Sequence, residues 1–333
     1  MKKIFRSPRG RVAAAAMTSL VIGCAALTGC STNASPAESQ DGELASIKAI
    51  VAPIAFEPAY IAQRKGFFKE AGLEVEIIPG ADAQANFAQA LSGAVDIVTT
   101  SWTVMATSNA EGVPVSVIAG NGYINPEKAQ SGIVVPADSE IKSYSDLAGK
   151  TLGVLGVRSG SDLAVMLAAE DNGVKPDDIV QVAVPYAGMQ AAVEQGSIDA
   201  GMVVDPYYSQ MLNAGLKSIG TPQSEYTANV PVTVWAATDQ WVQSHAGTAE
   251  KFTAAMEKAA AYYNDPANAE EVRAITAEIN GTNLDKVPKT LSAISVSLDQ
   301  AAASKNLDDL SRLGYTTREV SYADVVWDGA PVK

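Results

Sequence analysis

Short runs of β-branched and aliphatic residues alternate with longer helical patterns along most of the chain. This order is typical of parallel sheets wrapped by helices, because each crossover between parallel strands carries a helix over one face of the sheet. The sequence therefore predicts an α/β fold. Nine strands are expected, at Ile47–Val51, Glu74–Ile78, Val95–Thr99, Val115–Ala119, Gly132–Val135, Thr151–Leu155, Ile179–Val184, Ala200–Val203 and Val232–Ala237.

Two similar junctions indicate that the chain forms two lobes of similar build. Gly93-Ala94-Val95-Asp96 and Gly196-Ser197-Ile198-Asp199 each lead from a predicted helix into a predicted strand. Coincidence is the alternative, since such junctions are common in α/β proteins. Two lobes facing each other would leave a cleft at the carboxyl ends of their strands, where open sheets bind ligands. We expect the chain to cross between the lobes at Gly132–Val135 and Val232–Trp235.

After Thr238 the pattern becomes almost entirely helical. The expected helices lie at Thr248–Asn264, Pro266–Ile279 and Leu307–Leu313. We expect them to pack back on the first lobe.

Residues 1–29 predict an export signal. A basic head is followed by the uncharged apolar run Val12–Leu27, whose 16 residues fall short of the about 20 that a membrane-spanning helix needs. The run ends in Leu27-Thr28-Gly29-Cys30, which looks like a bacterial lipobox with cleavage before Cys30 and lipidation of its thiol. A plain signal peptide is the alternative. Residues 30–46 are small and polar, so we expect a flexible tether to the extracytoplasmic face of the membrane.

Charge and composition exclude several classes of function. Cleavage removes five cations and takes the net charge from −13 to −18, which argues against a nucleic-acid partner. The signal carries away Cys24, and His245 is the only histidine. These residues are too few for a metal centre or a thiol enzyme, so we expect no metal and no cofactor.

The segment Glu57–Val75 (EPAYIAQRKGFFKEAGLEV) is similar to the opening of solute-binding proteins of nitrate/sulfonate/taurine-type ABC importers. Asp205-Pro206-Tyr207 resembles the acidic-Pro step of that family. Further motifs follow in the family's order, at Gly93–Ile97, Gly112–Val115, Ser145–Val154 and Gly196–Ala200. The resemblance covers Ile47 to Gly314. It implies a two-lobed periplasmic-binding-protein-like fold of type II, with two parallel-rich sheets flanked by helices, a cleft and two hinge crossings.

The resemblance also implies a domain division and partners. Lobe I would comprise residues 47–132 and 236–333, and lobe II residues 133–235 including the hinge strands. The protein would be a monomer that delivers its solute to an ABC permease and its ATPase, and it would not be an enzyme.

The chain departs from part of the family at the end of the first strand. Members that bind a thiamine-precursor pyrimidine often carry a histidine there, where this chain has Ile54-Ala55-Phe56-Glu57.

The loop Arg158–Asp162 is the strongest candidate for ligand binding. Ser159 and Asp162 fit a capping box at the start of a helix. The free first-turn amides and the Arg158 guanidinium could hold a carboxylate or sulfonate, with a solvated arginine as the alternative.

Other candidates stand at predicted strand ends, as hydroxyls, aromatic rings, an amide and two carboxylates. Each aromatic ring taken singly is more often a packing residue. Ser101 fits a helix cap, which leaves Thr100 or Trp102 to donate to a ligand, and Asn121 could equally be a turn residue. The candidate ligand-binding residues are Phe56, Glu57, Thr100, Ser101, Trp102, Asn121, Tyr123, Arg158, Ser159, Ser161, Tyr186, Asp205, Tyr207 and Trp235.

These residues predict capture of a small organic anion, a sulfonate or carboxylate with an apolar or aromatic body. One alternative ligand is a neutral or cationic heterocycle such as a thiamine-precursor pyrimidine or another vitamin. Two other functions remain open, namely an enzyme on the same two-lobe fold and a ligand-sensing partner of a membrane receptor.

Overall fold

The computed structural model describes residues 44–81 and 83–333, and the chain from Glu43 onward forms one compact unit. The predicted export signal, the lipobox at Cys30 and the tether up to residue 43 lie outside the described residues. Strand β1 (Ala45–Val51) includes the last two residues of the predicted tether, Ala45 and Ser46. Within the described ranges, no helix has both the length and the apolar character needed to cross a bilayer.

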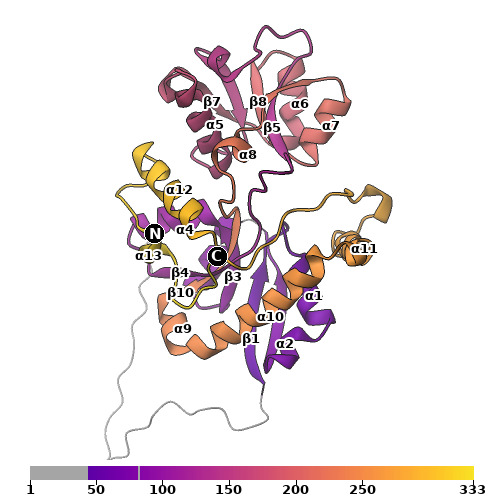
Figure 1. The fold of residues 1–333 in the computed structure, drawn as a ribbon, viewed down its shortest axis with the longest axis vertical. Helices are drawn as coiled ribbons and strands as arrows, with labels where there is room; N and C mark the ends of the chain where they lie inside the picture. The colour runs from indigo at the N-terminus through magenta and orange to yellow at the C-terminus, as the bar shows by residue number, and fades with distance from the viewer. Residues whose placement is uncertain (1–43, 82) are drawn as a thin grey trace, which may run out of the picture. The chain divides into compact units, whose positions relative to one another are not determined.

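The first sheet has five strands in the order β2-β1-β3-β10-β4 (Figure 1). The bounds of the other four strands are Leu73–Pro79 for β2, Ile97–Ser101 for β3, Val115–Gly120 for β4 and Thr233–Thr238 for β10. β1 runs parallel to β2 and β3, whereas β10 is antiparallel to both β3 and β4. The sheet is therefore mixed, with a late strand inserted among early ones.

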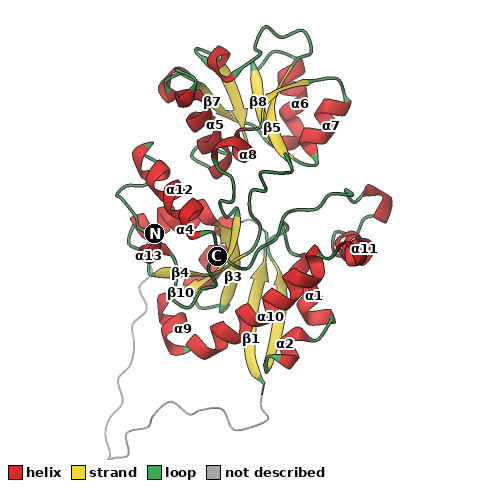
Figure 2. Cartoon of the chain, in the orientation of Figure 1, coloured by secondary structure: helices red, strands yellow, loops and turns green. Residues whose placement is uncertain are grey.

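The second sheet repeats this plan in the order β7-β6-β8-β5-β9. Its strands span Ser131–Val135 for β5, Thr151–Val154 for β6, Val180–Ala183 for β7, Ala200–Val204 for β8 and Lys217–Gly220 for β9. β6 is parallel to β7 and β8, and β5 is antiparallel to β8 and β9. Figure 2 shows the two sheets as separate groups of strands, each accompanied by its own helices.

Asp96 and Asp199, the acids of the two repeated junctions, make the same contacts in the two sheets. The Asp96 carboxylate accepts the Lys48 N–H at 2.8 Å, and the Asp96 N–H donates to the Lys48 carbonyl at 3.0 Å. Asp199 and Thr151 repeat both bonds at 2.7 and 2.9 Å. The sequence echo therefore marks a shared junction that fixes β3 and β8 to their neighbouring central strands.

Helices cover both faces of each sheet, because strand side chains alternate between two faces. In β1, for example, Ile47 packs in the same apolar cluster as Phe252, while Ile50 packs in the cluster of Met105 on the other face. The helices are α1 (Glu57–Arg64), α2 (Phe67–Glu70), α3 (Ala83–Leu91), α4 (Trp102–Ala110), α5 (Gly160–Asp171), α6 (Tyr186–Glu194), α7 (Tyr207–Asn213), α8 (Pro222–Tyr226), α9 (Asp239–Ser244), α10 (Ala246–Asn264), α11 (Ala269–Ile279), α12 (Gln300–Arg312) and α13 (Tyr322–Val325).

The predicted positions of the two crossings are wrong. Gly132–Val135 belongs to β5 in the middle of the second sheet, and Thr233–Trp235 belongs to β10 in the first sheet. These runs are apolar and buried, so their backbone groups are paired within the sheets. The chain crosses instead through residues 121–130 and 227–232, which pair with each other: the Ile124 N–H donates to the Val230 carbonyl at 3.0 Å.

Helix α5 adds a third connection between the lobes, where the sequence predicted only the two crossings. Val165 and Met166 on one face pack in the core of the second sheet. Leu163 on another face joins the apolar cluster of Trp102 and Leu310, which belongs to the first lobe. Burial on two sides explains why nearly the whole helix is apolar.

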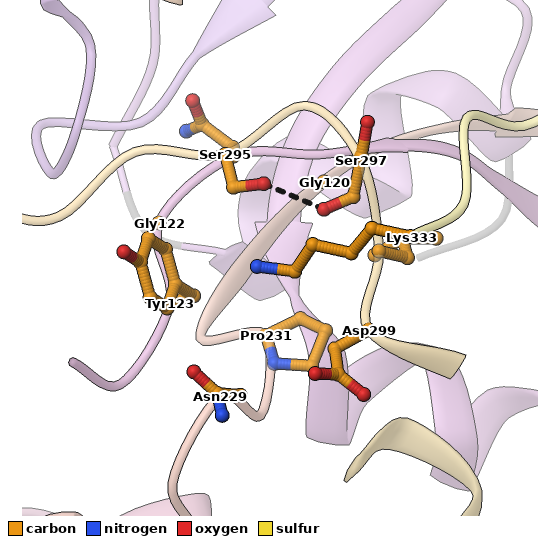
Figure 3. Close-up of a pocket in the computed structure, with 11 residues that line it drawn as sticks. Gly120, Gly122, Tyr123, Asn229, Pro231, Ser295, Ser297, Asp299 and Lys333 are labelled. Carbon is orange, nitrogen blue, oxygen red and sulfur yellow. Dashed lines mark hydrogen bonds between the residues drawn. The ribbon is translucent and has the colours of Figure 1, made fainter. Parts of the chain in front are cut away.

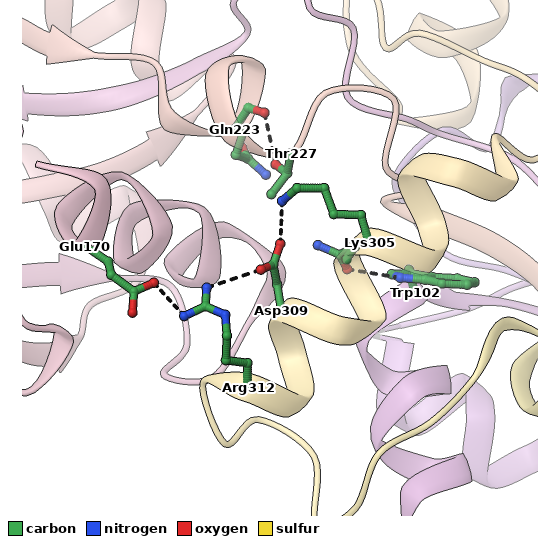
Figure 4. Close-up of polar contacts among 8 residues, drawn as sticks. Trp102, Glu170, Gln223, Thr227, Lys305, Asp309 and Arg312 are labelled. Carbon is green, nitrogen blue, oxygen red and sulfur yellow. Dashed lines mark hydrogen bonds and ion pairs between the residues drawn. The ribbon is translucent and has the colours of Figure 1, made fainter.

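Polar contacts accompany this interface. The Arg312 guanidinium on α12 donates to the Glu170 carboxylate on α5 at 2.6 Å, and also to Asp309 at 3.2 Å (Figure 4). These side chains and Lys305 line an open groove of about 350 Å³ between α12 and α5. The C-terminal helix α12 therefore also contacts α5 of the second lobe, in addition to the two crossings.

Candidate functional site

The loop before α5 is built around one buried carboxylate. Asp162 is 0 % exposed, and its Oδ2 accepts the Arg158 N–H at 2.9 Å. Its Oδ1 accepts the Ser159 N–H, while the Ser159 hydroxyl caps the helix. The predicted capping box is confirmed. Burial raises the pKa of Asp162, and the hydrogen bonds from Ser159, Tyr315 and the loop amides oppose that rise.

Arg158 stands exposed in this loop with φ of 65°, in the left-handed region that residues with a side chain rarely adopt. Its guanidinium carbon lies 5.6 Å from the centre of the Tyr315 ring. In the described part of the chain, two other non-glycine residues have positive φ, Ala55 and Asn229. Ala55 follows β1 and Arg158 follows β6, which hold equivalent places in the two sheets. Strain of this kind concentrates at functional loops.

The first lobe presents a second helix start close to this loop. Ser101 caps α4 by accepting the Val104 N–H at 3.1 Å, as the alternative for this residue predicted. In the same turn, the Thr103 hydroxyl would lie 3.1 Å from a Cβ placed on Gly160. The first turns of α4 and α5 therefore approach each other from the two lobes, and both bring the positive end of a helix dipole.

Two tyrosines of the second lobe lie side by side, and one of them contacts Ser161 of α5. The rings of Tyr186 and Tyr207, both half-buried, lie 5.5 Å apart. Burial raises the pKa of Tyr186 to about 12, and a hydrogen bond with Ser161 opposes the rise. Asp205 Oδ1 accepts two hydrogen bonds from Ser209, one from its N–H at 3.0 Å and one from its hydroxyl at 2.7 Å. Asp205 therefore holds the first turn of α7.

Three of the candidate aromatic residues lie in the core. Phe56, Trp102 and Trp235 are 4, 1 and 1 % exposed. Trp102 Nε1 donates to Asn306 at 3.1 Å, and the Trp235 ring meets Phe252 edge-on at 5.1 Å. Their rings contact other protein side chains, so these three residues have the alternative role that the sequence allowed, as packing residues.

Glu57 and Thr100 are also buried. Glu57 is 5 % exposed, and its carboxylate accepts the Thr276 hydroxyl at 2.9 Å. Burial raises the pKa of Glu57, and no cation is among the causes that oppose it. Thr100 is 1 % exposed within β3. Glu57 thus faces α11, away from Arg158.

Asn121 and Tyr123 lie at the outgoing crossing. Asn121 Nδ2 donates to the Ala55 carbonyl at 3.0 Å, whereas its Oδ1 is buried and has no hydrogen-bond partner among the described residues. Both residues line a small cavity together with Lys333, whose Nζ lies 5.0 Å from the centre of the Tyr123 ring (Figure 3). Asn121 therefore ties the crossing to the loop that contains the strained Ala55.

Sequence reasoning missed several residues around the site. Tyr315 touches Asp162 and Arg158, yet 153 positions separate it from Asp162. Exposed aliphatic side chains follow β1 and β6, with Ile54 at 58 %, Leu155 at 52 % and Val157 at 51 % exposure. The signal for the last two was present, because the apolar run of the β6 strand continues past its last paired residue, Val154.

The only histidine lies apart from these residues. His245 is exposed between α9 and α10 and stacks on Trp241 with 5.1 Å between ring centres. Across residues 44–81 and 83–333, no group of three or more His, Cys, Asp and Glu side chains is arranged to hold a metal ion.

Comparison with known proteins agrees with this architecture. The chain is similar to the putative binding protein YtlA of Bacillus subtilis, with 26% identity over 243 residues, 72% of this chain and 71% of YtlA. It is also similar to the 4-amino-5-hydroxymethyl-2-methylpyrimidine phosphate synthase THI13 of Saccharomyces cerevisiae, with 26% identity over 50% of this chain and 48% of that enzyme. The periplasmic aliphatic sulphonate binding protein SsuA of Escherichia coli shares the fold, with a TM-score of 0.70 and 17% identity over 86% of this chain and 98% of SsuA.

These findings confirm the predicted two-lobed, periplasmic-binding-protein-like fold, and the sheets expected to be rich in parallel strands are mixed. They also confirm the resemblance to solute-binding proteins of the nitrate/sulfonate/taurine type. The family model for NMT1/THI5-like proteins matches residues 54–269, which is more than half of the chain. The chain therefore belongs to the NMT1/THI5-like family.

Proposed function

We propose that the protein is an extracytoplasmic solute-binding protein that captures a small organic anion between its two lobes and delivers it to an ABC importer. The observation that carries the proposal is the approach of two helix N-termini, α4 from the first lobe and α5 from the second, beside the exposed Arg158. The positive ends of the two helix dipoles favour a carboxylate or sulfonate there, and the guanidinium adds a charged fork.

The surroundings support an aliphatic body on this anion. Ile54, Leu155 and Val157 expose aliphatic surface in the loops after β1 and β6, whereas Phe56, Trp102 and Trp235 are enclosed by protein. Tyr186 and Tyr207 remain as partly exposed rings on the second lobe. These side chains follow the carboxyl ends of β1 and β6, which is the edge where open α/β sheets bind ligands, and they would suit an aliphatic body.

The finer aspects of this role extend the proposal beyond the site. Cys30 would carry a lipid anchor that keeps the protein on the extracytoplasmic face of the membrane, with residues up to 43 as the tether. The protein would act as a monomer beside a permease and its ATPase, and it would bind its solute without transforming it. The resemblance to YtlA and SsuA supports this role.

The second candidate is binding or synthesis of a thiamine-precursor pyrimidine. The similarity to THI13, whose name describes a pyrimidine phosphate synthase, favours it. A pyrimidine would use the rings of Tyr186 and Tyr207 and would not need Arg158.

A thermal-shift screen of alkanesulfonates, taurine, aromatic acids, nitrate and pyrimidines tests the two candidates. A ligand present at 100 times its Kd should stabilise the protein by about 2.7 kcal/mol. Arg158→Ala should weaken the binding of an anion roughly thirtyfold to several thousandfold, because it removes one partner of a charge-assisted pair. Arg64→Ala is the matched control, since Arg64 pairs with Glu278 on α11 of the first lobe.

The anion proposal fails if a pyrimidine stabilises the protein, every anion is inert, and Arg158→Ala leaves the pyrimidine shift unchanged. Conversion of a pyrimidine precursor by the purified protein would instead support an enzyme.

A further inference from the structure

Tyr315 comes from the segment after α12 and reaches the second lobe. Gly314, with φ of 72°, ends α12, and the Tyr315 N–H donates to the Leu310 carbonyl at 2.7 Å. The ring is 9 % exposed and packs in the apolar cluster of Trp102 and Leu310. Its backbone is thus fixed on the first lobe while its hydroxyl points at the second.

The Tyr315 hydroxyl completes the hydrogen bonding of the Arg158 loop. It donates to Asp162 Oδ2 at 2.8 Å, the same oxygen that accepts the Arg158 N–H at 2.9 Å. Burial, followed by the nearby Asp162 carboxylate, raises the pKa of Tyr315, so the phenol keeps the proton that it donates. One buried carboxylate therefore joins a phenol of the first lobe to the backbone of the loop in the second.

The ring makes a separate contact with the side chain of Arg158. The guanidinium carbon lies 5.6 Å from the ring centre, within the range of cation–π attraction. Arg158 needs such support because its left-handed backbone conformation is unfavourable for a residue with a side chain. Tyr315 therefore contacts the arginine through its ring and, through Asp162, holds the arginine's backbone amide.

We propose that Tyr315 is a positioning residue for Arg158, so that the anion-binding loop of the second lobe is held in its binding conformation by a side chain of the first. The inference rests on the proposed function, in which Arg158 contacts the bound anion. Tyr315 itself does not touch the ligand in this arrangement. Its effect on affinity passes through the position of Arg158.

Two conservative variants separate positioning from general stability. Tyr315→Phe keeps the ring over Arg158 and removes only the hydroxyl that Asp162 accepts. Tyr322→Phe is the matched control in the same C-terminal part of the chain, because the Tyr322 hydroxyl is buried without a hydrogen-bond partner among the described residues. Both variants lose one oxygen atom, and only the first loses a hydrogen bond.

The first measurement follows binding of butanesulfonate to the purified full-length chain by titration calorimetry. Tyr315→Phe should weaken binding about fivefold, a coupling typical of residues in one hydrogen-bond network, and Tyr322→Phe should leave it unchanged. In an Arg158→Ala background, Tyr315→Phe should change the affinity less than about twofold. An equal loss in both backgrounds would overturn the inference, because it would show that Tyr315 does not act through Arg158.

The second measurement needs no ligand. Hydrogen exchange at the amides of Arg158 and Ser159 should quicken in Tyr315→Phe and stay at the wild-type rate in Tyr322→Phe. Unchanged exchange would overturn the positioning role whatever the protein binds. If exchange quickens while no anion of the screening panel binds the wild type, the positioning role stands and the anion-binding function has failed.

Discussion

Leu163→Ala should loosen the contact between the lobes as well as destabilise the protein. Leu163 is 0 % exposed, and its partners include Trp102 and Leu310 of the first lobe. Truncating a buried leucine costs about 2–5 kcal/mol, depending on how far the surroundings close over the cavity. Because Leu163 packs where residues of both lobes meet, and side chains at such a boundary can close over a cavity, we expect the lower part of that range, about 2–3 kcal/mol.

The matched control is a residue of the same helix that belongs to a different apolar cluster. Met166 is 2 % exposed and packs in the core of the second lobe, so Met166→Ala should cost a similar free energy within that lobe. Denaturant unfolding gives the free energies, and small-angle scattering of the ligand-free protein gives the radius of gyration. We expect an increase in radius for Leu163→Ala alone. Equal radii for the two variants would refute the idea that α5 acts as a third connection.

Three further changes test other parts of the molecule. Glu57→Gln should stabilise the protein at pH 8 and change its stability little near pH 4. Folding raises the pKa of this buried carboxyl. The contribution of Glu57 to the free energy of unfolding is therefore complete below the unfolded pKa of about 4.3, and it is lost as the pH rises through the folded pKa. Thermal melts at both pH values measure this, and a melting temperature that falls in Glu57→Gln, or that changes equally at both pH values, would contradict the prediction. Arg312→Ala should lower the free energy of unfolding by at most about 1 kcal/mol, and this loss should vanish in 1 M salt. The reason is that the ion pair with Glu170 is about half exposed. A larger loss of stability that does not depend on salt would contradict this prediction. Cys30→Ser should release the protein from the membrane fraction, and a processed variant that stays with the membranes would exclude the lipid anchor.

Local signals in the sequence predicted most of the fold. Apolar runs gave the strands, and the junctions at Asp96 and Asp199 proved to be equivalent in their hydrogen bonds. The capping box of Ser159 and Asp162 was also predictable, because a helix start depends on a few neighbouring residues. The crossings were misplaced because a buried central strand and an extended linker have the same apolar, β-branched composition.

The candidate site was less predictable because it depends on contacts between distant residues. No local pattern distinguishes a tryptophan at a strand end that faces a ligand from one that packs on a later helix, as Trp235 does on Phe252. Tyr315 gave no signal, since its partner Asp162 belongs to the other lobe. Glu57 was a candidate because it follows a predicted strand end. Its carboxylate instead contacts Thr276 of α11, a helix more than 200 residues later in the chain.

The close approach of Thr103 and Gly160 has a practical consequence. Both cysteines of the chain, Cys24 and Cys30, precede residue 44, so the two-lobed body carries no thiol of its own. A single cysteine introduced at Thr103, in a chain that begins after Cys30, could be labelled selectively with an environment-sensitive dye. Because Gly160 offers no side chain opposite it, the dye would sense the second lobe's backbone directly, and movement of the lobes would become a fluorescence signal for the solute.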